Sequence, residues 1–237
     1  MMSTDNTIKN DQKSILAIGH NWNSGEALEP RSVTNPIHAH TLDRTNVLKP
    51  DVEGEAPGAI VIEIDDAYAL SDTLELIGTL REKYAELVVI TNINYNSPHA
   101  KIECYRAGAD HCIYAPNDPD KKAELISVLF ESPEWRPSIR LTLDQTCLHL
   151  SDDKLKLDLA YQEMKVLDAL INAQGNILHH DSIAEAMGLN IRLYDSRVLE
   201  KSISRLRNKI KRNFGINIIH SVRGYGYRLL RGVMSAK

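Results

Sequence analysis

The stretch DSRVLEKSISRLRNKIKR, residues 195–212, decides how the C-terminal part of this chain folds. On a helix with about 100° of rotation per residue, its apolar residues fall in one sector and its cations nearly opposite. The apolar residues are Leu199, Ile203, Leu206 and Ile210, and the cations are Arg197, Lys201, Arg205 and Arg212. Because Glu200 is the only acid after Asp195, this pattern predicts an amphipathic helix whose outer face suits a polyanion such as nucleic acid. The alternative is an amphipathic helix whose charged face only contacts water.

The segment INIIHSVRGYGYRLL, residues 216–230, is predicted to form a β-hairpin. Its β-branched and aromatic residues flank Gly224 and Gly226, and Arg223 lies at the tip. A helix followed by such a hairpin suits a protein that places the helix in the major groove of DNA. The arginine then lies near the adjacent minor groove or the backbone.

Residues 155–231 resemble the winged-helix effector domain of OmpR/PhoB-type response regulators. The resemblance rests on three segments in order: LKLDLAYQEMKVLDALINAQGNILHHDSIAEAMG, DSRVLEKSISRLRNKI and IIHSVRGYGYRLL. It implies an α+β winged helix-turn-helix domain with a recognition helix at 197–212 and a wing at 221–229. It also implies DNA contacts from Arg197, Arg205, Arg207 and Arg223. The remaining residues that we expect to contact double-stranded DNA are Lys201, Ser202, Lys209, Arg212 and Tyr225.

The two halves of the chain carry opposite charge. Residues 1–137 contain 12 Lys+Arg and 22 Asp+Glu, a net charge of −10, and residues 138–237 contain 16 and 10, a net charge of +6, which together give the −4 of the whole chain. Phosphates repel the acidic half, so we expect only the C-terminal half to touch DNA. The acidic half suits protein contacts, with RNA polymerase as one candidate partner. The segment ESPEWRP, residues 131–137, is predicted to be the linker.

The N-terminal half alternates short apolar runs with helical segments. Strands are predicted at 14–18, 59–62, 87–90 and 111–114, and helices at 72–84, 98–107 and 119–130. Between 25 and 57 the pattern is poor, with prolines at 30, 36 and 50, so a shortened or irregular first helix is expected there. This order of elements indicates an α/β fold.

Residues 14–130 resemble the receiver domains of response regulators. The similar segments are PGAIVIEI from Pro57, LVVIT ending at Thr91, and Ala107-Gly-Ala-Asp110. The resemblance implies a doubly wound five-stranded parallel receiver domain with a site at the carboxyl ends of its strands. The predicted organisation is a disordered tail at 1–13, a receiver-like domain at 14–130, the linker, and a winged-helix domain at 138–237.

The residues at the expected phosphoacceptor site depart from the receiver pattern. A receiver has an acidic pair after the first strand, an acceptor aspartate after the third and a lysine after the fifth. Here the matching positions hold Gly19 and His20, Glu63, and Ala115, and only Thr91 is retained. Mg²⁺ needs hard carboxylate ligands, and a phosphoryl group needs cations to neutralise it. We therefore expect no phosphorylation here.

Two alternatives stay open at this site. A shifted alignment on Leu80-Arg81 makes Asp65 the acceptor of an ordinary two-component regulator. With Glu63 in that position instead, the glutamate either mimics a phosphorylated aspartate by reaching toward Thr91 or is a relic without a role.

Receivers of this family commonly pair through their fourth and fifth helices and the strand between them. The charged residues that we expect on this face are Lys101, Arg106, Asp110, Lys121 and Lys122. They predict a homodimer that forms without a phosphodonor and places two effector domains on tandem half-sites.

Other features of the sequence exclude several classes of protein. No hydrophobic run is long enough to span a membrane, and three cysteines are too few for a disulfide scaffold, so a cytoplasmic protein is expected. The pairs His38/His40 and His179/His180 lack thiolate or carboxylate partners at ligand spacing. We expect no enzyme activity, no metal and no cofactor. Another hypothesis is an interaction protein whose DNA contact is incidental.

Overall fold

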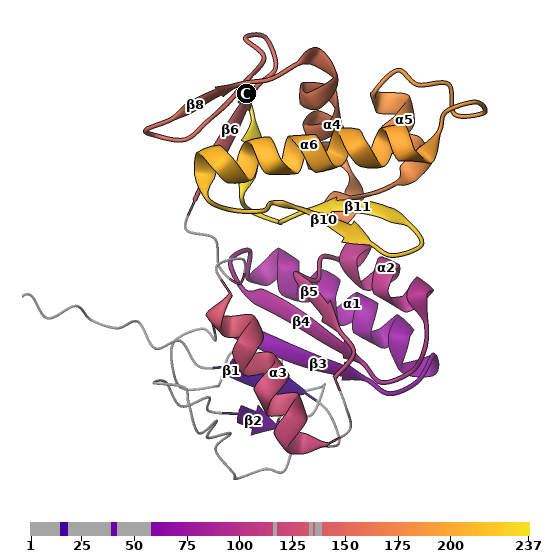
Figure 1. Ribbon diagram of the computed structural model, residues 1–237. Coiled ribbons are helices and arrows are strands. Elements are labelled where there is room, and N and C mark those ends of the chain that lie inside the picture. The colour runs from indigo at the N-terminus through magenta and orange to yellow at the C-terminus, as the bar shows by residue number, and fades with distance from the viewer. Residues whose placement is uncertain (1–14, 19–38, 42–57, 116–117, 133–134, 136–138) are drawn as a thin grey trace, which may run out of the picture.

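The computed structural model describes residues 15–18, 39–41, 58–115, 118–132, 135 and 139–237. The N-terminal domain contains a parallel sheet of five strands in the order β2-β1-β3-β4-β5 (Figure 1). Its strands are β1 (Ile15–Ile18), β2 (Ala39–Thr41), β3 (Ala59–Ile64), β4 (Val88–Ile93) and β5 (His111–Ile113). This is the strand order of doubly wound sheets of the flavodoxin type, so the predicted fold class is confirmed.

Helices cover both faces of this sheet. They are α1 (Tyr68–Lys83), α2 (Pro98–Ala107) and α3 (Pro119–Glu131). Helices α1 and α2 pack on the face that carries Ile60 and Ile62, whereas Ile126 of α3 packs on the opposite face with Ala59 and Val61. The predicted helices agree with these bounds to within a few residues. The irregular helix expected between 25 and 57 lies outside the described residues.

The C-terminal domain begins with a sheet in the order β12-β6-β7-β8. Its strands are β6 (Leu141–Asp144), β7 (His149–Ser151), β8 (Lys156–Asp158) and β12 (Met234–Ala236). Strand β12 runs parallel to β6, so the end of the chain returns to the beginning of the domain.

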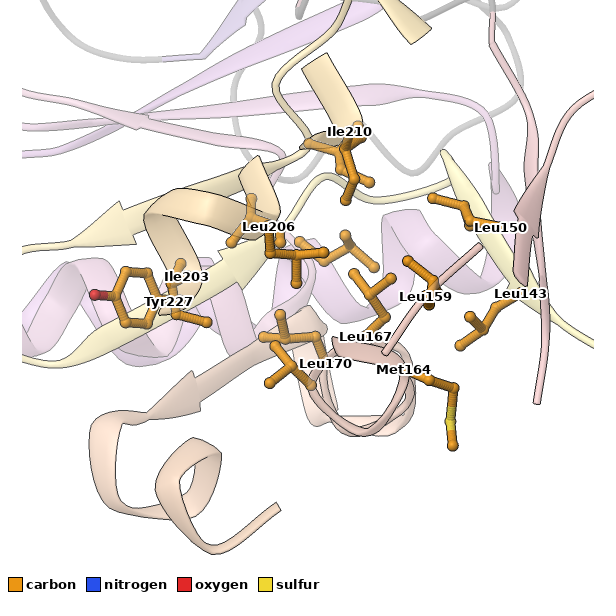
Figure 2. Packing of buried hydrophobic residues seen from close by; sticks show 14 of the residues in the cluster. Leu143, Leu150, Leu159, Met164, Leu167, Leu170, Ile203, Leu206, Ile210 and Tyr227 are labelled. Carbon is orange, nitrogen blue, oxygen red and sulfur yellow. The ribbon is translucent and has the colours of Figure 1, made fainter. Parts of the chain in front are cut away.

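Three helices and a second sheet complete the C-terminal domain. The helices are α4 (Tyr161–Asn172), α5 (His180–Ala186) and α6 (Ser196–Phe214), and the 3-10 turn η1 spans Gln174–Asn176. The sheet has the order β10-β11-β9, with β9 (Ile177–His179), β10 (Ile219–Val222) and β11 (Gly226–Leu229). Leu143 and Leu150 of the first sheet, Leu167 of α4, Leu206 of α6 and Tyr227 of β11 meet in one core (Figure 2).

Helix α6 forms where the sequence predicts it. The side chain of Asp195 caps its start by accepting a hydrogen bond of 2.9 Å from the Arg197 N–H. Gly215 ends it at a φ of 75°, a conformation that favours glycine. The four residues of the apolar sector, Leu199, Ile203, Leu206 and Ile210, are all buried.

None of the helices in the described part of the chain is both long enough and apolar enough to span a bilayer.

Candidate nucleic-acid interface

The outer face of α6 and the tip of the β10–β11 hairpin form a basic surface. Its exposed cations include Arg197, Lys201, Arg205, Arg212 and Arg223. No side-chain hydrogen bond or ion pair holds any of these five within the described residues, so their charges face solvent. This arrangement provides several cations for phosphates and guanidinium groups that match the edges of bases.

Arg207 differs from the exposed arginines because it connects α6 to the hairpin. Its Nη2 donates a hydrogen bond of 2.9 Å to Ser221 Oγ, and its guanidinium lies 5.1 Å from the centroid of the Tyr227 ring. Burial lowers the pKa of Arg207. Arg207 was expected to contact DNA, but here it fixes the position of the hairpin against the helix.

Lys209 and Ser202 are also engaged within the protein. Lys209 Nζ donates to Glu163 Oε2 at 2.6 Å, and Glu163 Oε2 also accepts the Ala160 N–H at 2.9 Å at the start of α4. Ser202 Oγ donates to the carbonyl of Val198 at 2.9 Å. Lys209 keeps two further N–H donors and Ser202 keeps acceptor lone pairs, so their contacts with DNA remain predictions.

Tyr225, on the hairpin, points toward the N-terminal domain. Its hydroxyl accepts a hydrogen bond of 2.7 Å from Arg106 Nη2 of α2, and the Arg106 guanidinium lies 5.7 Å from its ring centroid. The ring also contacts His179 edge to face at 5.3 Å. Tyr225 was expected to contact DNA, and Arg106 was expected to contact a second protomer. In this structure the two side chains contact each other instead.

A second bond between the domains involves Asp110, just before β5. Its carboxylate accepts from Arg231 Nε at 2.8 Å, from the Val89 N–H at 2.8 Å and from Arg81 of α1. Burial raises the pKa of Asp110, but Arg81 and Arg231 outweigh burial and hold the pKa below its ordinary range. Asp110 thus joins α1, β4 and the C-terminal domain, and its carboxylate does not lie on an open pairing face.

The surface between the domains is closely packed beside these bonds. Figure 1 shows that β10 and β11 lie between α6 and α2. A Cβ atom added at Gly175 would lie 2.0 Å from the carbonyl oxygen of Tyr105 in α2. Only glycine therefore lets this turn lie so close to α2. Arg228, which is buried, lies over the Tyr105 ring at 4.2 Å. The same cation faces His111 and His220, and burial together with Arg228 lowers the pKa of each histidine to about 4.

The expected phosphoacceptor site holds an internal ion pair. Glu63, near the end of β3, accepts a hydrogen bond from Lys122 Nζ of α3. The side chain of Glu63 is fully buried, and that of Lys122 is 4% exposed. Lys122 was expected on an exposed dimer face, and that expectation is wrong, because its ammonium points into the domain. Lys121, its neighbour, is exposed, and Lys101 Nζ lies 5.5 Å from the centroid of the Tyr114 ring.

Strand geometry separates Glu63 from Thr91. Successive side chains of a strand point to opposite faces, and Ile62 pairs with Thr91 whereas Glu63 pairs with Asn92. Glu63 therefore points toward α3 together with Ala59 and Val61. Thr91 points toward α2, on the face of the buried Cys104 and Cys112. The hypothesis that Glu63 reaches toward Thr91 is wrong.

The other residues expected at the acceptor site have separate contacts. Asn92 Oδ1 accepts the Ala115 N–H at 2.8 Å, and Ala115 is buried without a charge to offer. Asp65 is exposed and accepts from Asn94 Nδ2 at 2.6 Å. Asp66 accepts the Ala69 N–H at 2.8 Å at the start of α1. Gly19 and His20 lie outside the described residues.

Reasoning from the sequence alone missed Lys122 as the partner of Glu63 and Arg231 as the partner of Asp110. A signal for Lys122 exists, because it precedes Ile126 by four residues and therefore lies on the apolar stripe of α3. Arg231 carries no comparable signal, since its partner is 121 residues away in the sequence.

Comparisons with known proteins show similarity to transcriptional regulators. Residues 154–229 match the family model described as "Transcriptional regulatory protein, C terminal". The transcriptional regulatory protein PhoP of Escherichia coli K12 is 25% identical over 163 residues, which are 66% of this chain and 72% of PhoP. The transcriptional regulatory protein PcoR of Escherichia coli is 25% identical over 175 residues, 71% of this chain and 77% of PcoR.

Among solved structures, the response regulator DrrB of Thermotoga maritima, described as an OmpR/PhoB homolog, is 17% identical. The match covers 92% of this chain and 99% of DrrB, with a TM-score of 0.40. The C-terminal domain thus matches a family of transcriptional regulatory proteins, and about two thirds of the chain is similar to curated regulators of this kind.

Proposed function

We propose that this protein regulates transcription without phosphorylation of its receiver domain. The observation that carries the proposal is the buried ion pair between Glu63 and Lys122. In this reading the pair takes the position that an acceptor aspartate would hold in an ordinary receiver. Lys122 supplies a permanent neutralising charge, so Glu63 needs neither Mg²⁺ nor a phosphoryl donor.

The charges around the site support this proposal. A phosphoryl group brings nearly two negative charges. On Asp65 it would meet Asp66 next to it in the sequence, without a lysine at position 115 to neutralise it. The Lys122 ammonium is already engaged with Glu63. Repulsion is therefore expected to outweigh any gain from transfer.

We further propose that the receiver domain acts through its α2–β5 surface. In a single chain, Arg106 and Asp110 of this surface bond to Tyr225 and Arg231 of the C-terminal domain. When the C-terminal domain is released, the same surface becomes the pairing face of a homodimer. Two basic helices then occupy tandem half-sites about one helical turn apart, and the acidic domain remains accessible to RNA polymerase.

The test exposes the full-length protein to acetyl phosphate and Mg²⁺. We expect no added phosphoryl mass and no change in affinity for a selected DNA site. An unrelated receiver with an intact acceptor aspartate serves as the control for the reagent. A stoichiometric acyl phosphate would refute the proposal. If Asp65→Asn then abolished it, the protein would be an ordinary two-component regulator that uses Asp65.

A further inference from the structure

The hairpin between β6 and β7 brings together three side chains that bind metals. Asp144, the last residue of β6, pairs directly with His149, the first residue of β7, and Cys147 lies in the turn between them. One potential ligand atom from each residue lies within 4.8 Å of the others. The sequence pattern is D-x-x-C-x-H, so six consecutive residues contain all three groups.

We propose that Asp144, Cys147 and His149 bind one Zn²⁺ ion. Thiolate, imidazole and carboxylate are the ligands that zinc uses in proteins, and a set with one soft sulfur favours zinc over Mg²⁺ or Ca²⁺. Three protein ligands leave the fourth tetrahedral position to water. This site goes beyond the proposed regulatory function, and it differs from the sequence expectation that no metal is bound.

The turn holds the ligands near one another before any metal enters. Asp144 Oδ1 accepts the Cys147 N–H at 2.7 Å, which closes the turn. Leu148, between two of the ligands, has a φ of 53°, a left-handed conformation that is uncommon for leucine. In this conformation the ligand atoms of Cys147 and His149, on either side of Leu148, lie within 4.8 Å of each other. Nδ1 of His149 is buried and has no hydrogen-bond partner in the described part of the chain.

The distances require only a small adjustment. Bonds of about 2.0–2.3 Å to a tetrahedral zinc place neighbouring ligand atoms roughly 3.3–3.8 Å apart. From separations of at most 4.8 Å, the three atoms therefore approach by about 1.5 Å or less, through rotation of the exposed Cys147 side chain. On binding, the Cys147 thiol loses its proton to the solvent and the Zn–S bond forms. The thiolate and the carboxylate then balance the two charges of the ion.

Binding at this site is expected to be reversible. Leu143 and Leu150 of the same hairpin are fully buried in the core, which packs without help from a metal. The ion therefore adds to the stability of the first sheet and is not required for folding. Its occupancy follows the concentration of free zinc.

The test uses the untagged full-length protein, kept reduced, with Co²⁺ as a spectroscopic probe for Zn²⁺. We expect one Co²⁺ per chain, a thiolate-to-cobalt charge-transfer band in the near ultraviolet and displacement of the band by Zn²⁺. Cys147→Ser should abolish the band. Asp144→Asn and His149→Ala should each weaken Zn²⁺ binding at least about tenfold. His99→Ala, which removes an exposed histidine of α2, is the matched control and should change nothing.

A second measurement needs no variant. Zn²⁺ should protect Cys147 of the native protein from alkylation by iodoacetamide, as located by mass spectrometry of peptides. Co²⁺ binding without a thiolate band, a band that persists in Cys147→Ser, or equal alkylation of Cys147 with and without Zn²⁺ would each overturn the proposal.

Discussion

Lys122 is an unusual residue for the interior of a domain. An ammonium group loses its hydration when it is buried, and only a close carboxylate with good geometry compensates for that loss. Glu63 provides such a carboxylate from β3, and the pair connects the sheet to α3. Each residue of the pair therefore lowers the cost of burying the other.

Substitution of either partner alone should destabilise the N-terminal domain. Lys122→Met leaves a buried carboxylate without its cation, and we expect a loss of about 3–5 kcal/mol in the free energy of unfolding. The double variant Glu63→Gln/Lys122→Met should recover most of this loss. Denaturant unfolding followed by circular dichroism measures both, and Lys121→Met is the matched control because Lys121 is exposed on the same helix. Equal stability of Lys122→Met and Lys121→Met would contradict the role of the ion pair.

The sequence predicted which residues stand at the acceptor site better than it predicted their contacts. Glu63 lies in β3, Thr91 in β4 and Ala115 two residues after β5, close to where the predicted strands put them, because apolar runs identify strands well. The side to which each residue points depends on register, and a shift of one residue reverses it. Only the observed pairing of Ile62 with Thr91 shows that the side chains of Thr91 and Glu63 point to opposite faces of the sheet.

At the scale of elements, some cations of α6 face solvent and others contact the rest of the domain. Arg205 faces solvent, whereas Arg207 is bonded to Ser221 and packs on Tyr227. The spacing of cations on a helix cannot distinguish these two arginines, because the difference arises from the hairpin that packs beside only one of them.

Removal of Arg205 should affect DNA binding alone. Arg205→Ala is expected to cost about 1–3 kcal/mol of binding to a specific site if the side chain contacts a guanine, with an unchanged melting temperature. Arg223→Ala should also weaken binding. Arg207→Ala should lower both DNA affinity and stability, since it releases the hairpin.

Fluorescence anisotropy at physiological salt measures these affinities, and calorimetry measures the melting temperatures. Lys154→Ala, which removes an exposed cation on the turn between β7 and β8, is the matched control. If Arg205, Arg207 and Arg223 could all be replaced without loss of affinity, α6 and the hairpin would not form the DNA-binding surface.

Long helices were predicted more reliably than short strands. The apolar sector of α6, from Leu199 to Ile210 in a helix of 19 residues, identifies the helix. Strands β7, β8, β9 and β12 each contain three residues, too few for a period of two to emerge from the sequence.

At the scale of the whole molecule, the contact between the domains should respond to acid. His111 and His220 lie on opposite sides of this contact, and the pKa of each is lowered to about 4 from an ordinary value near 6.5. The groups that face them include Arg228, Asp110, Arg207 and the ring of Trp135. Both histidines are therefore neutral in the folded protein at neutral pH.

Because the folded pKa values are lowered, the unfolded chain binds protons first as the pH falls below about 6.5. Stability should decrease from there to about pH 4, by at most about 1.4 kcal/mol per pH unit for each histidine. Thermal unfolding of the full-length protein across this range tests the prediction. The double variant His111→Gln/His220→Gln should show a shallower slope, and an identical slope would contradict it.

The ion pair between Glu63 and Lys122 also has a consequence for timing. An acyl phosphate hydrolyses, so an ordinary receiver switches itself off after each stimulus. A salt bridge between two side chains has no such lifetime, and no phosphatase can remove it. If the protein acts without phosphorylation as proposed, the duration of the response is set by synthesis, degradation and dissociation from DNA. Cells would then control this regulator through its copy number.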